Sequence, residues 1–557
     1  MKKFKLYIIV ILHLLFLTHQ TFSQKISPYF FGQCAWMPDS IGSKKYSGKL
    51  HSKWKDIKNS NAQIIRFGGI GVDENMPTNH QYIEIIDSII ANGMEPMIQV
   101  PFYNGKYTAS QAAEIVKYIN IIKGKNIKYW IIGNELDHVY GYTSSSQIAS
   151  YFKTFASAMK AVDPSIKTIG PEMARYNTKI IDDLTTPHGP DDITGKDDAG
   201  RYYLDIISFH TYPFNGSQSR SSVISNLTDL GKFQDNLSSL NSRITNSNNA
   251  HGRTGSNTLK MAVTEANVNW QNNESDNLYG VGANSFIGGQ FWAEMMGIAL
   301  KEGVEFFNFW SVVEGNNQAL NIGYIDRFSG NRQPTFHHFK MMSDNFKGEH
   351  CDGITNLADI KSFGSKNTDQ IVVMILNQSG NNYNYTLRLN TGTVSGNSVL
   401  KININANVDL EYTDVINNQS SILLVFDVDG NIIKKCDYNI EVHASANLPP
   451  SCNTYTKKST PTIATTSAGP PGLKVYPNPA KDDFTVDYTA GHATEEKVAI
   501  KMIDQTGKVI ISKELDLLEG QIKEKVELRD YSISSGIYVL QLTSGNDVYN
   551  SRIILTK

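Results

Sequence analysis

Eight short apolar runs alternate with helix-like segments along residues 25–347. The runs are Tyr29–Trp36, Ala62–Phe67, Glu95–Val100, Ile127–Asn134, Thr168–Pro171, Leu204–His210, Lys260–Glu265 and Val304–Trp310. Each has the length of a strand, and its near-continuous apolar character is typical of parallel strands that are buried on both faces. The first half of the chain therefore predicts a parallel sheet.

The segments between these runs carry apolar residues with the 3.6-residue period of an amphipathic helix. The stripes are Tyr82, Ile85, Ile86, Ile89 and Ile90; Ala112, Ile115, Val116, Ile119 and Ile122; and Ile148, Phe152, Phe155, Met159 and Val162. Gly93 and Pro164 end the first and third helices, and Ser110 and Gly124 bound the second. We interpret Asn215–Asn257 as a long polar insertion. Eight strand–helix units over about 320 residues predict a (β/α)8 TIM barrel at 25–347.

The pattern changes at about Gly348, where helical stripes give way to short alternating runs. These runs are Gln370–Leu376, Tyr385–Leu389, Ser398–Ile404 and Ser421–Phe426. They predict a β-sandwich at 348–442, although a β-rich cap on the barrel stays an alternative. Residues 443–472 are rich in Thr, Ser, Pro and Ala and predict a linker. Alternating β patterns return at 473–557.

The N-terminus has the features of a secretory signal peptide at residues 1–23. Lys2, Lys3 and Lys5 precede the apolar run Tyr7–Leu17, and Ser23-Gln24 offers a cleavage point. That run is short for a bilayer span, so we expect secretion rather than an anchored helix. No later segment predicts a membrane span.

Composition adds few constraints. The 557 residues are 40% hydrophobic and 19% charged, with a net charge of −2, which does not favour a nucleic-acid partner and fits a neutral polymer. Four cysteines allow three pairings. Cys436 and Cys452 are the favoured pair, and Cys34 and Cys351 can pair only if the fold brings them together. Since no Cys-x-x-Cys or His cluster has metal-ligand spacing, we predict no cofactor or metal. We also expect a monomer.

The candidate chemistry lies where runs four and seven end. Gly133-Asn134-Glu135 and Glu265 place polar residues directly after apolar strands. In a parallel barrel, the carboxyl ends of the strands form the face that carries active sites. Glycoside hydrolysis needs two carboxyl groups, one to protonate the leaving oxygen and one to attack or to activate water. The sequence therefore predicts that Glu135 and Glu265 face each other over a glycosidic bond.

This pair of strand-end glutamates resembles the glycoside hydrolases of clan A, with families 39 and 51 the nearest. The resemblance covers about Lys25–Phe346. It implies that Glu135 is the acid/base and Glu265 the nucleophile of a retaining double displacement. A retaining enzyme places its two carboxyl groups ~5–5.5 Å apart.

Further residues have supporting roles by the same resemblance. Arg66 corresponds to an arginine that bonds the nucleophile and would keep it ionised. His210 and Tyr212 resemble the clan's His-x-Tyr, whose tyrosine bonds the nucleophile. Asn134 can hold the sugar 2-hydroxyl, and Trp310 can form the floor of the subsite for the reacting sugar. Each of three residues also has a purely structural alternative. Arg66 can form a structural ion pair, His210 can be a hydrogen-bonded core histidine, and Trp310 can simply pack in the core.

Other residues near the predicted strand ends are weaker candidates. Trp36, Gln99 and Trp270 lie where loops begin, and substrate contact and a purely structural role are equally favoured for each of them. Glu172 lies at the end of strand five, where its position fits substrate contact better than catalysis. Asp137 and Glu314 also lie near strand ends, where we expect loop or binding residues rather than catalytic ones.

The last 85 residues or so carry a second resemblance. Val475-Tyr476-Pro477-Asn478-Pro479-Ala480, Gly507-Lys508-Val509 and Ser535-Gly536-Ile537-Tyr538 resemble the type A C-terminal sorting domain of the Bacteroidetes type IX secretion system. The resemblance implies that residues 473–557 are an export address, recognised by the type IX machinery. An ordinary β-sandwich binding module is the alternative.

Together these features predict a secreted or surface-attached, retaining glycoside hydrolase acting on a polysaccharide or oligosaccharide. The leading interpretation is an endo-acting β-glycanase of the β-glucan, xylan or mannan type. An exo-acting glycosidase, such as an arabinofuranosidase or xylosidase, is the alternative. A non-catalytic barrel that only binds glycan is the alternative of another class, and the presence of both glutamates argues against it.

Overall fold

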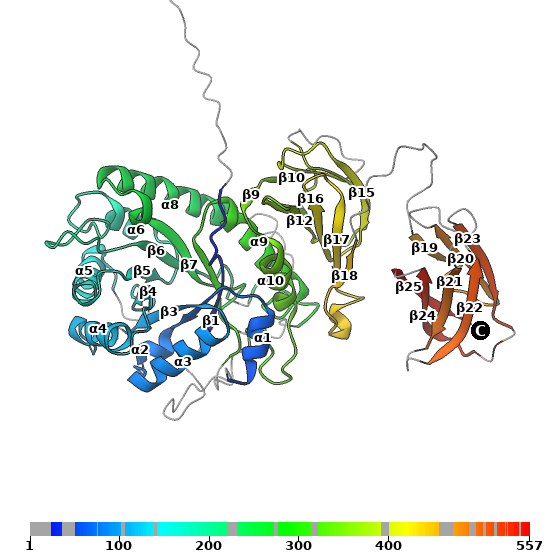
Figure 1. Ribbon diagram of the computed structural model, residues 1–557, viewed down its shortest axis with the longest axis horizontal. Coiled ribbons are helices and arrows are strands. Elements are labelled where there is room, and N and C mark those ends of the chain that lie inside the picture. The colour runs from blue at the N-terminus through cyan, green and yellow to red at the C-terminus, as the bar shows by residue number, and fades with distance from the viewer. Residues whose placement is uncertain are drawn as a thin grey trace, which may run out of the picture. The chain divides into compact units, whose positions relative to one another are not determined.

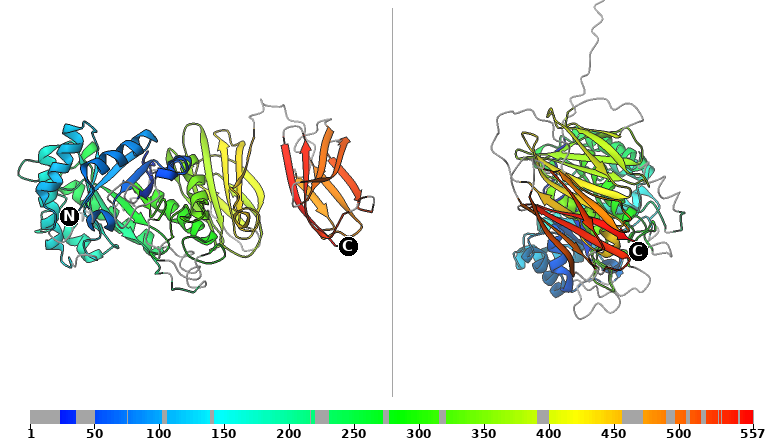
Figure 2. Two further views of the ribbon diagram at one scale, coloured as in Figure 1. Left: turned by 90° about the horizontal axis from the view of Figure 1, so that it is seen from below. Right: turned by 90° about the vertical axis from the view of Figure 1, so that its right-hand side faces the viewer.

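The structure is a computed structural model, in which the chain divides into two compact units, residues 1–457 and 458–557 (Figures 1 and 2). The predicted signal peptide at 1–23 and Trp36 lie outside the described residues. The residues that the structure describes are 24–35, 51–74, 76–101, 106–138, 142–215, 217–219, 231–271, 277–314, 321–390, 400–455, 472–489, 497–504, 508–516, 521–529, 531, 533–544 and 547–556.

Eight parallel strands close into a barrel, in which each strand pairs with the next along the chain and the last pairs with the first. The strands are β1 Phe31–Ala35, β2 Ile64–Phe67, β3 Glu95–Val100, β4 Tyr129–Ile132, β5 Lys167–Met173, β6 Ile206–Thr211, β7 Lys260–Ala266 and β8 Phe306–Phe309. Each overlaps one of the eight apolar runs, so the predicted TIM barrel is confirmed. Side chains such as Met97, Ile131 and Phe306 fill the barrel interior, and outward-facing ones such as Ile98 and Phe307 join the core beneath the helices.

The helices surround this barrel (Figure 1). They are α1 Trp54–Asn59, α2 Ile70–Glu74, α3 Asn79–Ala91, α4 Ala109–Val116 with a π-helical continuation at Lys117–Ile122, α5 Ser145–Val162, α6 Thr178–Thr185, α8 Gly231–Ala250, α9 Phe286–Lys301 and α10 Pro334–Asn345. Short 3-10 turns lie at His51–Lys53, Gly255–Asn257 and Ala444–Ala446. None of these helices is long and apolar enough to cross a membrane, within the part of the chain that the structure describes.

Three of the helices begin with the same reciprocal cap. Thr78, Thr108 and Ser144 each accept a hydrogen bond from the backbone N–H of a glutamine three residues later, and the glutamine side chain accepts from the cap backbone. The prediction of Ser110 as the cap of the second helix was therefore wrong. Thr108 has a glutamine, Gln111, three residues later to complete the box, whereas Ser110 has Ala113 at that position.

Helix α8 corrects the interpretation of Asn215–Asn257 as a polar insertion. Its buried positions Phe233, Leu237, Leu240 and Ile244 follow the spacing of one helix face. The stripe has a single apolar residue per turn, narrower than the stripes of the other helices. A 20-residue helix is therefore present where polar residues dominate the sequence.

A β-sandwich follows the barrel, as predicted. Its strands form one sheet in the order β10-β14-β13-β15 and another in the order β18-β17-β16-β12-β11-β9. They are β9 Glu349–Cys351, β10 Gly353–Thr355, β11 Ile360–Lys366, β12 Gln370–Asn377, β13 Tyr383–Arg388, β14 Leu400–Ile404, β15 Glu411–Ile416, β16 Ser420–Asp427, β17 Ile432–Asn439 and β18 Ser451–Thr454. On β12, Val372 and Met374 belong to the core shared with the barrel, whereas Ile371 and Val373 belong to the core between the two sheets. Burial on both faces explains why this strand has no polar alternation.

The six-stranded sheet packs on helices α9 and α10 of the barrel (Figure 1). A Cβ at Gly297 of α9 would lie 2.1 Å from the Phe363 ring, so glycine permits this close approach. Gln290 of α9 donates from Nε2 to the carbonyl oxygens of Asn377 (3.0 Å) and Ser420 (3.1 Å). Buried apolar contact and paired polar groups therefore hold the sandwich to the barrel.

The edge strand β18 lies inside the range 443–472 that the sequence assigned to a linker. It pairs with β17, and the Cys436–Cys452 disulfide joins the two strands with an S–S distance of 2.00 Å. This cysteine pairing was predicted, and its consequence is that residues 451–454 belong to the sheet. Cys34 and Cys351 are buried free thiols.

Glu294 on α9 gives the first unit a pH-dependent stability. Its Oε2 accepts from Gln378 Nε2 (2.7 Å), and Lys361 Nζ lies 3.8 Å from its Oε1. Burial raises the pKa of Glu294 to about 7. Because the folded-state pKa is raised, this stabilising contribution is complete below about pH 4 and is lost as the pH rises through 7.

Glu294→Gln should therefore flatten the pH dependence of stability. At pH 8–9 the variant avoids a cost of up to about 3 kcal/mol for the buried charge, whereas at pH 4–5 it gains nothing. Thermal unfolding of both proteins at pH 5 and pH 9 measures the difference. An equal loss of melting temperature between these two pH values in the wild type and the variant would contradict the prediction.

The second unit is all-β, as predicted. Two sheets, β19-β20-β23 and β22-β21-β24-β25, enclose a core of alternating residues that includes Val486, Ile500 and Leu540. The strands are β19 Gly472–Tyr476, β20 Asp483–Thr489, β21 Lys497–Ile503, β22 Val509–Asp516, β23 Gln521–Glu527, β24 Gly536–Ser544 and β25 Asp547–Leu555.

Candidate active site

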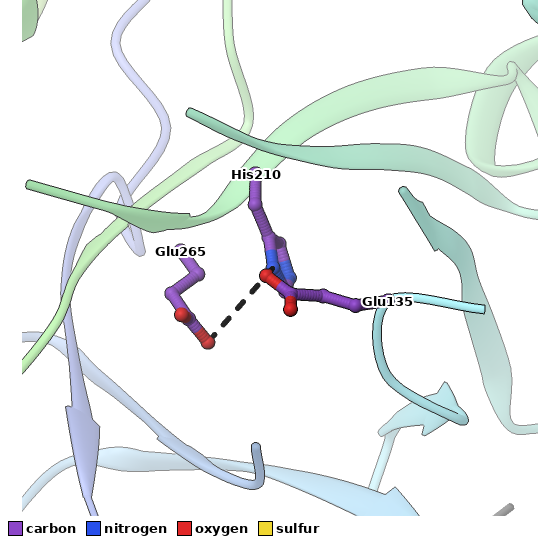
Figure 3. Close-up of side chains that lie close together, drawn as sticks. All are labelled: Glu135, His210 and Glu265. Atoms are coloured by element: carbon purple, nitrogen blue, oxygen red, sulfur yellow. Dashed lines mark hydrogen bonds and ion pairs between the residues drawn. The ribbon is translucent and has the colours of Figure 1, made fainter. Parts of the chain in front are cut away.

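Glu135 and Glu265 meet at the carboxyl-terminal mouth of the barrel. Their carboxyl groups point toward each other from opposite sides, with the His210 ring beside Glu135 (Figure 3). One oxygen of each carboxyl and one nitrogen of His210 all lie within 4.8 Å of one another. This separation is near that of the two carboxyl groups in retaining glycosidases and well below the ~6.5–9.5 Å of inverting ones.

Local backbone irregularity aims these side chains. Glu135 and Glu172 have positive φ values of 47° and 54°, a region that costs a non-glycine residue about 1–3 kcal/mol. The N–H of Glu135 donates to the carbonyl oxygen of Glu172 (2.8 Å). Register shifts interrupt the β5–β6, β6–β7 and β7–β8 pairings, one of them at Phe209/His210. Such irregularities at the rim of a barrel redirect side chains so that they point into the site.

Two donors hold the carboxylate of Glu265. Arg66 Nη1 donates to Oε2 (2.8 Å), and the Tyr212 hydroxyl donates to Oε1 (2.6 Å). Burial and the charge of Glu265 raise the pKa of Tyr212 well above its usual value, so Tyr212 stays a neutral donor. Although burial opposes the charge of Arg66, Glu172 and the other acidic groups nearby raise the pKa of the guanidinium. Both oxygens of Glu265 are thus oriented by hydrogen bonds.

His210 links Glu135 to Glu172. Its Nδ1 lies 2.9 Å from Glu135 Oε1, and its Nε2 lies 3.1 Å from Glu172 Oε2. Burial opposes the imidazolium, but the charge of Glu265 and the hydrogen bonds of Glu135 and Glu172 raise the pKa of His210 to about 10. Burial likewise opposes the Glu135 carboxylate, but the hydrogen bond from His210 and the positive charges nearby together lower the pKa of Glu135.

Glu172 is fully buried, so of the two roles predicted for it, substrate contact or support of the site, its position favours support. Oε1 accepts from the hydroxyls of Ser208 and Thr264, and Oε2 accepts from Arg66 Nη2 at 2.9 Å. Burial opposes its charge, but Arg66 and His210 lower the pKa of Glu172 to about 2. It is an ionised support beneath the two facing glutamates.

Ser208 and Thr264 were not among the predicted site residues. Ser208 precedes His210 by two positions on β6, and alternate residues of a strand face the same side. This period places Ser208 beside Glu172 on the neighbouring strand, and could have identified it. Thr264 precedes the bulged position of Glu265, where a simple alternation does not apply.

The remaining candidates divide between the mouth and its support. Asn134 is buried, and its Oδ1 accepts from Arg66 Nη2 (2.8 Å). Trp310 is 6% exposed and belongs to a cluster with Cys34, Ala283, Ile322 and Tyr212, and the Tyr212 hydroxyl donates to Glu265. Gln99 instead accepts from the Gly69 N–H (2.7 Å) and donates to Asp73 (2.7 Å), so its amide supports the segment after β2.

Three weaker candidates lie around the mouth. Asp137 accepts from the Ala174 N–H (2.8 Å), and burial raises the pKa of Asp137. Glu314 is buried and accepts from Ser311 Oγ (3.1 Å). Trp270 is half exposed.

Glu135, His210 and Glu265 are also the only group of potential metal ligands among the described residues. A divalent ion there would face the Arg66 guanidinium at close range and would compete with two donors already bound to Glu265. The donor set therefore fits a pair of carboxyl groups that act on a neutral substrate better than it fits a metal site.

Comparison with known proteins separates the two units. Residues 474–556 match the model of the secretion system C-terminal sorting domain. The second unit is a sorting domain. Among curated proteins, none matches the chain significantly.

The first unit is similar in structure to glycoside hydrolases. A family 51 alpha-L-arabinofuranosidase from Bifidobacterium longum superposes with a TM-score of 0.51 at 16% identity, over 66% of this chain and 85% of that chain. A bifunctional glucanase-xylanase from a metagenome library gives 0.48 at 16% identity, over 72% and 96%. A family 44 xyloglucanase from Paenibacillus polymyxa gives 0.48 at 13% identity, over 73% and 98%. The resemblance to clan A is confirmed for the fold, and the activity has to be argued from the site.

Proposed function

We propose that the first unit is a retaining glycoside hydrolase. The observation that carries the proposal is the pair of carboxyl groups at the barrel mouth, whose oxygens approach within 4.8 Å. A separation of this size leaves room for the anomeric carbon between the carboxyl groups, but not for a water molecule in addition. Direct attack by one carboxylate, followed by hydrolysis of the glycosyl-enzyme, fits this geometry.

The surroundings of the two groups support different roles. Glu265 accepts hydrogen bonds at both oxygens from Arg66 and Tyr212, which suits a carboxylate that attacks carbon. Glu135 Oε1 lies 2.9 Å from His210 Nδ1, and a hydrogen bond between these two atoms can supply the proton that an acid/base needs. We therefore assign Glu265 as the nucleophile and Glu135 as the acid/base.

Asn134 and Trp310 are proposed to bind the reacting sugar. Arg66 holds the Asn134 amide by its oxygen, and this fixes the direction of the NH2 group that would donate to the 2-hydroxyl. Trp310 lies beside Tyr212 in the same cluster, where its ring can stack on the apolar face of a sugar.

The substrate is proposed to be a neutral polysaccharide, cleaved internally by an endo-acting β-glycanase. Products from a panel of β-glucan, xylan and mannan substrates, and from aryl arabinofuranosides and xylosides, test this proposal. Oligosaccharides released from a polysaccharide support endo action, and monosaccharides alone point to the exo-acting alternative.

The same panel separates an enzyme from a barrel that only binds glycan. Glu135→Gln is the control, because it keeps the shape of the side chain and removes its proton transfer. Hydrolysis by the wild type that is absent from the variant identifies the barrel as the catalyst. Binding without hydrolysis by the wild type would contradict the proposal.

The sorting domain is proposed to deliver the chain to the cell surface or medium through type IX secretion. A chain that ends after Lys457 should therefore keep its hydrolytic activity and lose its export, since the barrel and sandwich form a unit of their own. Activity is measured on purified protein, and export by cell fractionation. The truncated Glu135→Gln variant controls for contaminating enzymes. A folded truncation without activity would contradict this division of labour.

A further inference from the structure

Glu172 has no task in the hydrolysis described above, yet four polar side chains lie within hydrogen-bond distance of its carboxylate. Ser208 and Thr264 donate to Oε1, whereas Arg66 Nη2 and His210 Nε2 lie 2.9 and 3.1 Å from Oε2. Glu172 is fully buried. A buried carboxylate beside a guanidinium is ionised, and an ionised carboxylate can only accept hydrogen bonds.

The hydrogens of Arg66 decide which nitrogen of His210 carries a proton. Nη2 has two hydrogens, and they point to Glu172 Oε2 and to Asn134 Oδ1 at 2.9 and 2.8 Å. None is left for His210 Nε2, whose 3.5 Å separation from Nη2 is also long for such a bond. Since Glu172 cannot donate, His210 Nε2 must itself donate to Glu172.

We propose that Glu172 is a positioning residue that fixes the Nε2–H form of His210, and that the His210 Nδ1–Glu135 Oε1 hydrogen bond stores the proton used in catalysis. With Nε2 committed to Glu172, the nitrogen that gains and loses a proton is Nδ1. This nitrogen lies 2.9 Å from Glu135 Oε1, so one proton serves both atoms. The inference rests on the proposed role of Glu135 as acid/base.

The charges around the imidazole favour keeping this proton. Arg66 on β2, Glu135 after β4, Glu172 on β5 and Glu265 on β7 all face His210, with Glu265 Oε2 3.9 Å from Nδ1. Three carboxylates, one guanidinium and one stored proton sum to a charge of −1. Loss of the proton would leave −2 in a buried site, whereas its transfer from Nδ1 to Oε1 leaves the sum unchanged.

Four other titratable groups border this cluster. Burial raises the pKa of the Cys34 thiol, and burial and Glu265 raise the pKa of the Tyr212 hydroxyl, so both of these groups stay neutral. Asp137 and His138 lie in the segment directly after Glu135, within range of electrostatic interaction with it.

The stored proton balances the reaction. In the first step it passes from Glu135 Oε1 to the glycosidic oxygen as the C1–O bond breaks and Glu265 bonds to C1. His210 Nδ1 and Glu135 Oε1 then share no proton, so both atoms can only accept hydrogen bonds. An incoming water molecule can donate to them, which favours its binding at this position. In the second step water attacks C1, the bond to Glu265 breaks, and Glu135 takes the water proton, which restores the pair.

The first test observes the tautomer directly. Full-length protein labelled with 15N at histidine, with His210→Gln to assign the signal, should show a proton on Nε2 across the pH range of activity. Only Nδ1 should titrate. A wild-type His210 without a proton on Nε2 would overturn the proposal, and this result needs neither a substrate nor a mutant of Glu172.

The second test uses Glu172→Leu, whose side chain has no hydrogen-bond acceptor, with two leaving groups. Without the carboxylate, Nε2 loses its acceptor and Nδ1–H becomes the favoured tautomer, so Glu135 receives no proton. We expect kcat/KM to fall about 10²-fold for an alkyl glycoside and little for an aryl glycoside with an acidic phenol. Removal of the negative charge of Glu172 should also lower the pKa of the stored proton. The pH at which kcat/KM falls on the alkaline side should therefore decrease by about one pH unit or more.

A structural role for Glu172 gives a different result. Equal losses for both leaving groups, with an unmoved alkaline limb, would overturn the proposal. Glu294→Leu is the matched control, since it removes a buried carboxyl outside the site and should change neither the His210 signals nor the alkaline limb of the pH profile. If no glycoside is hydrolysed by the wild type, the proposed function fails, and the 15N experiment still decides the tautomer.

Discussion

Replacement of Glu265 by alanine should abolish turnover and leave an enzyme that azide can rescue. The substitution removes the group that bonds to the anomeric carbon, and loss of a nucleophile lowers kcat by roughly 10⁴–10⁶-fold. It also opens space beside Arg66 and Tyr212, the two donors that held the carboxylate. A small anion can occupy this space and attack from the face that Glu265 used.

The product of that rescue reports the role of Glu265. A single displacement by azide gives a glycosyl azide of inverted configuration, which NMR identifies. Glu265→Gln is the matched control, because its amide fills the space and should prevent rescue. A rescued product with retained configuration would show that Glu265 is not the nucleophile.

Replacement of Glu135 by alanine should instead make activity depend on the leaving group. An alkyl glycoside needs a proton on its leaving oxygen, and general acid catalysis contributes about 10²–10⁴-fold. An aryl glycoside with an acidic phenol needs none, so its first step should stay fast. The glycosyl-enzyme on Glu265 then accumulates, because water lacks the base that activates it.

Azide distinguishes this variant from the previous one. It needs no base, so it should attack the accumulated intermediate and give a glycosyl azide of retained configuration. A burst of released phenol in the first turnover is the kinetic sign of the intermediate. Inverted azide from Glu135→Ala together with retained azide from Glu265→Ala would show that the two roles are assigned backwards.

The strands of the barrel and the helices α3, α4 and α5 could be predicted because their signals are local. An apolar run such as Glu95–Val100 is buried on both faces of a parallel sheet, and a stripe such as Tyr82–Ile90 covers one face of a helix. Helix α8 was missed because its stripe has one apolar residue per turn. The strand β18 was missed because four exposed residues, Ser451–Thr454, carry no apolar period.

The sequence by itself determined the barrel, the two β regions after it, and the placement of Glu135 and Glu265 at strand ends. These features follow from periodicity and from the rule that the carboxyl ends of parallel strands share one face. Only the tertiary structure decided that Glu172 lies beneath the site and that His210 joins it to Glu135. These contacts link residues 38 and 75 positions apart. They depend on the bulged register between strands and on two glutamates with positive φ, which no local pattern in the sequence specifies.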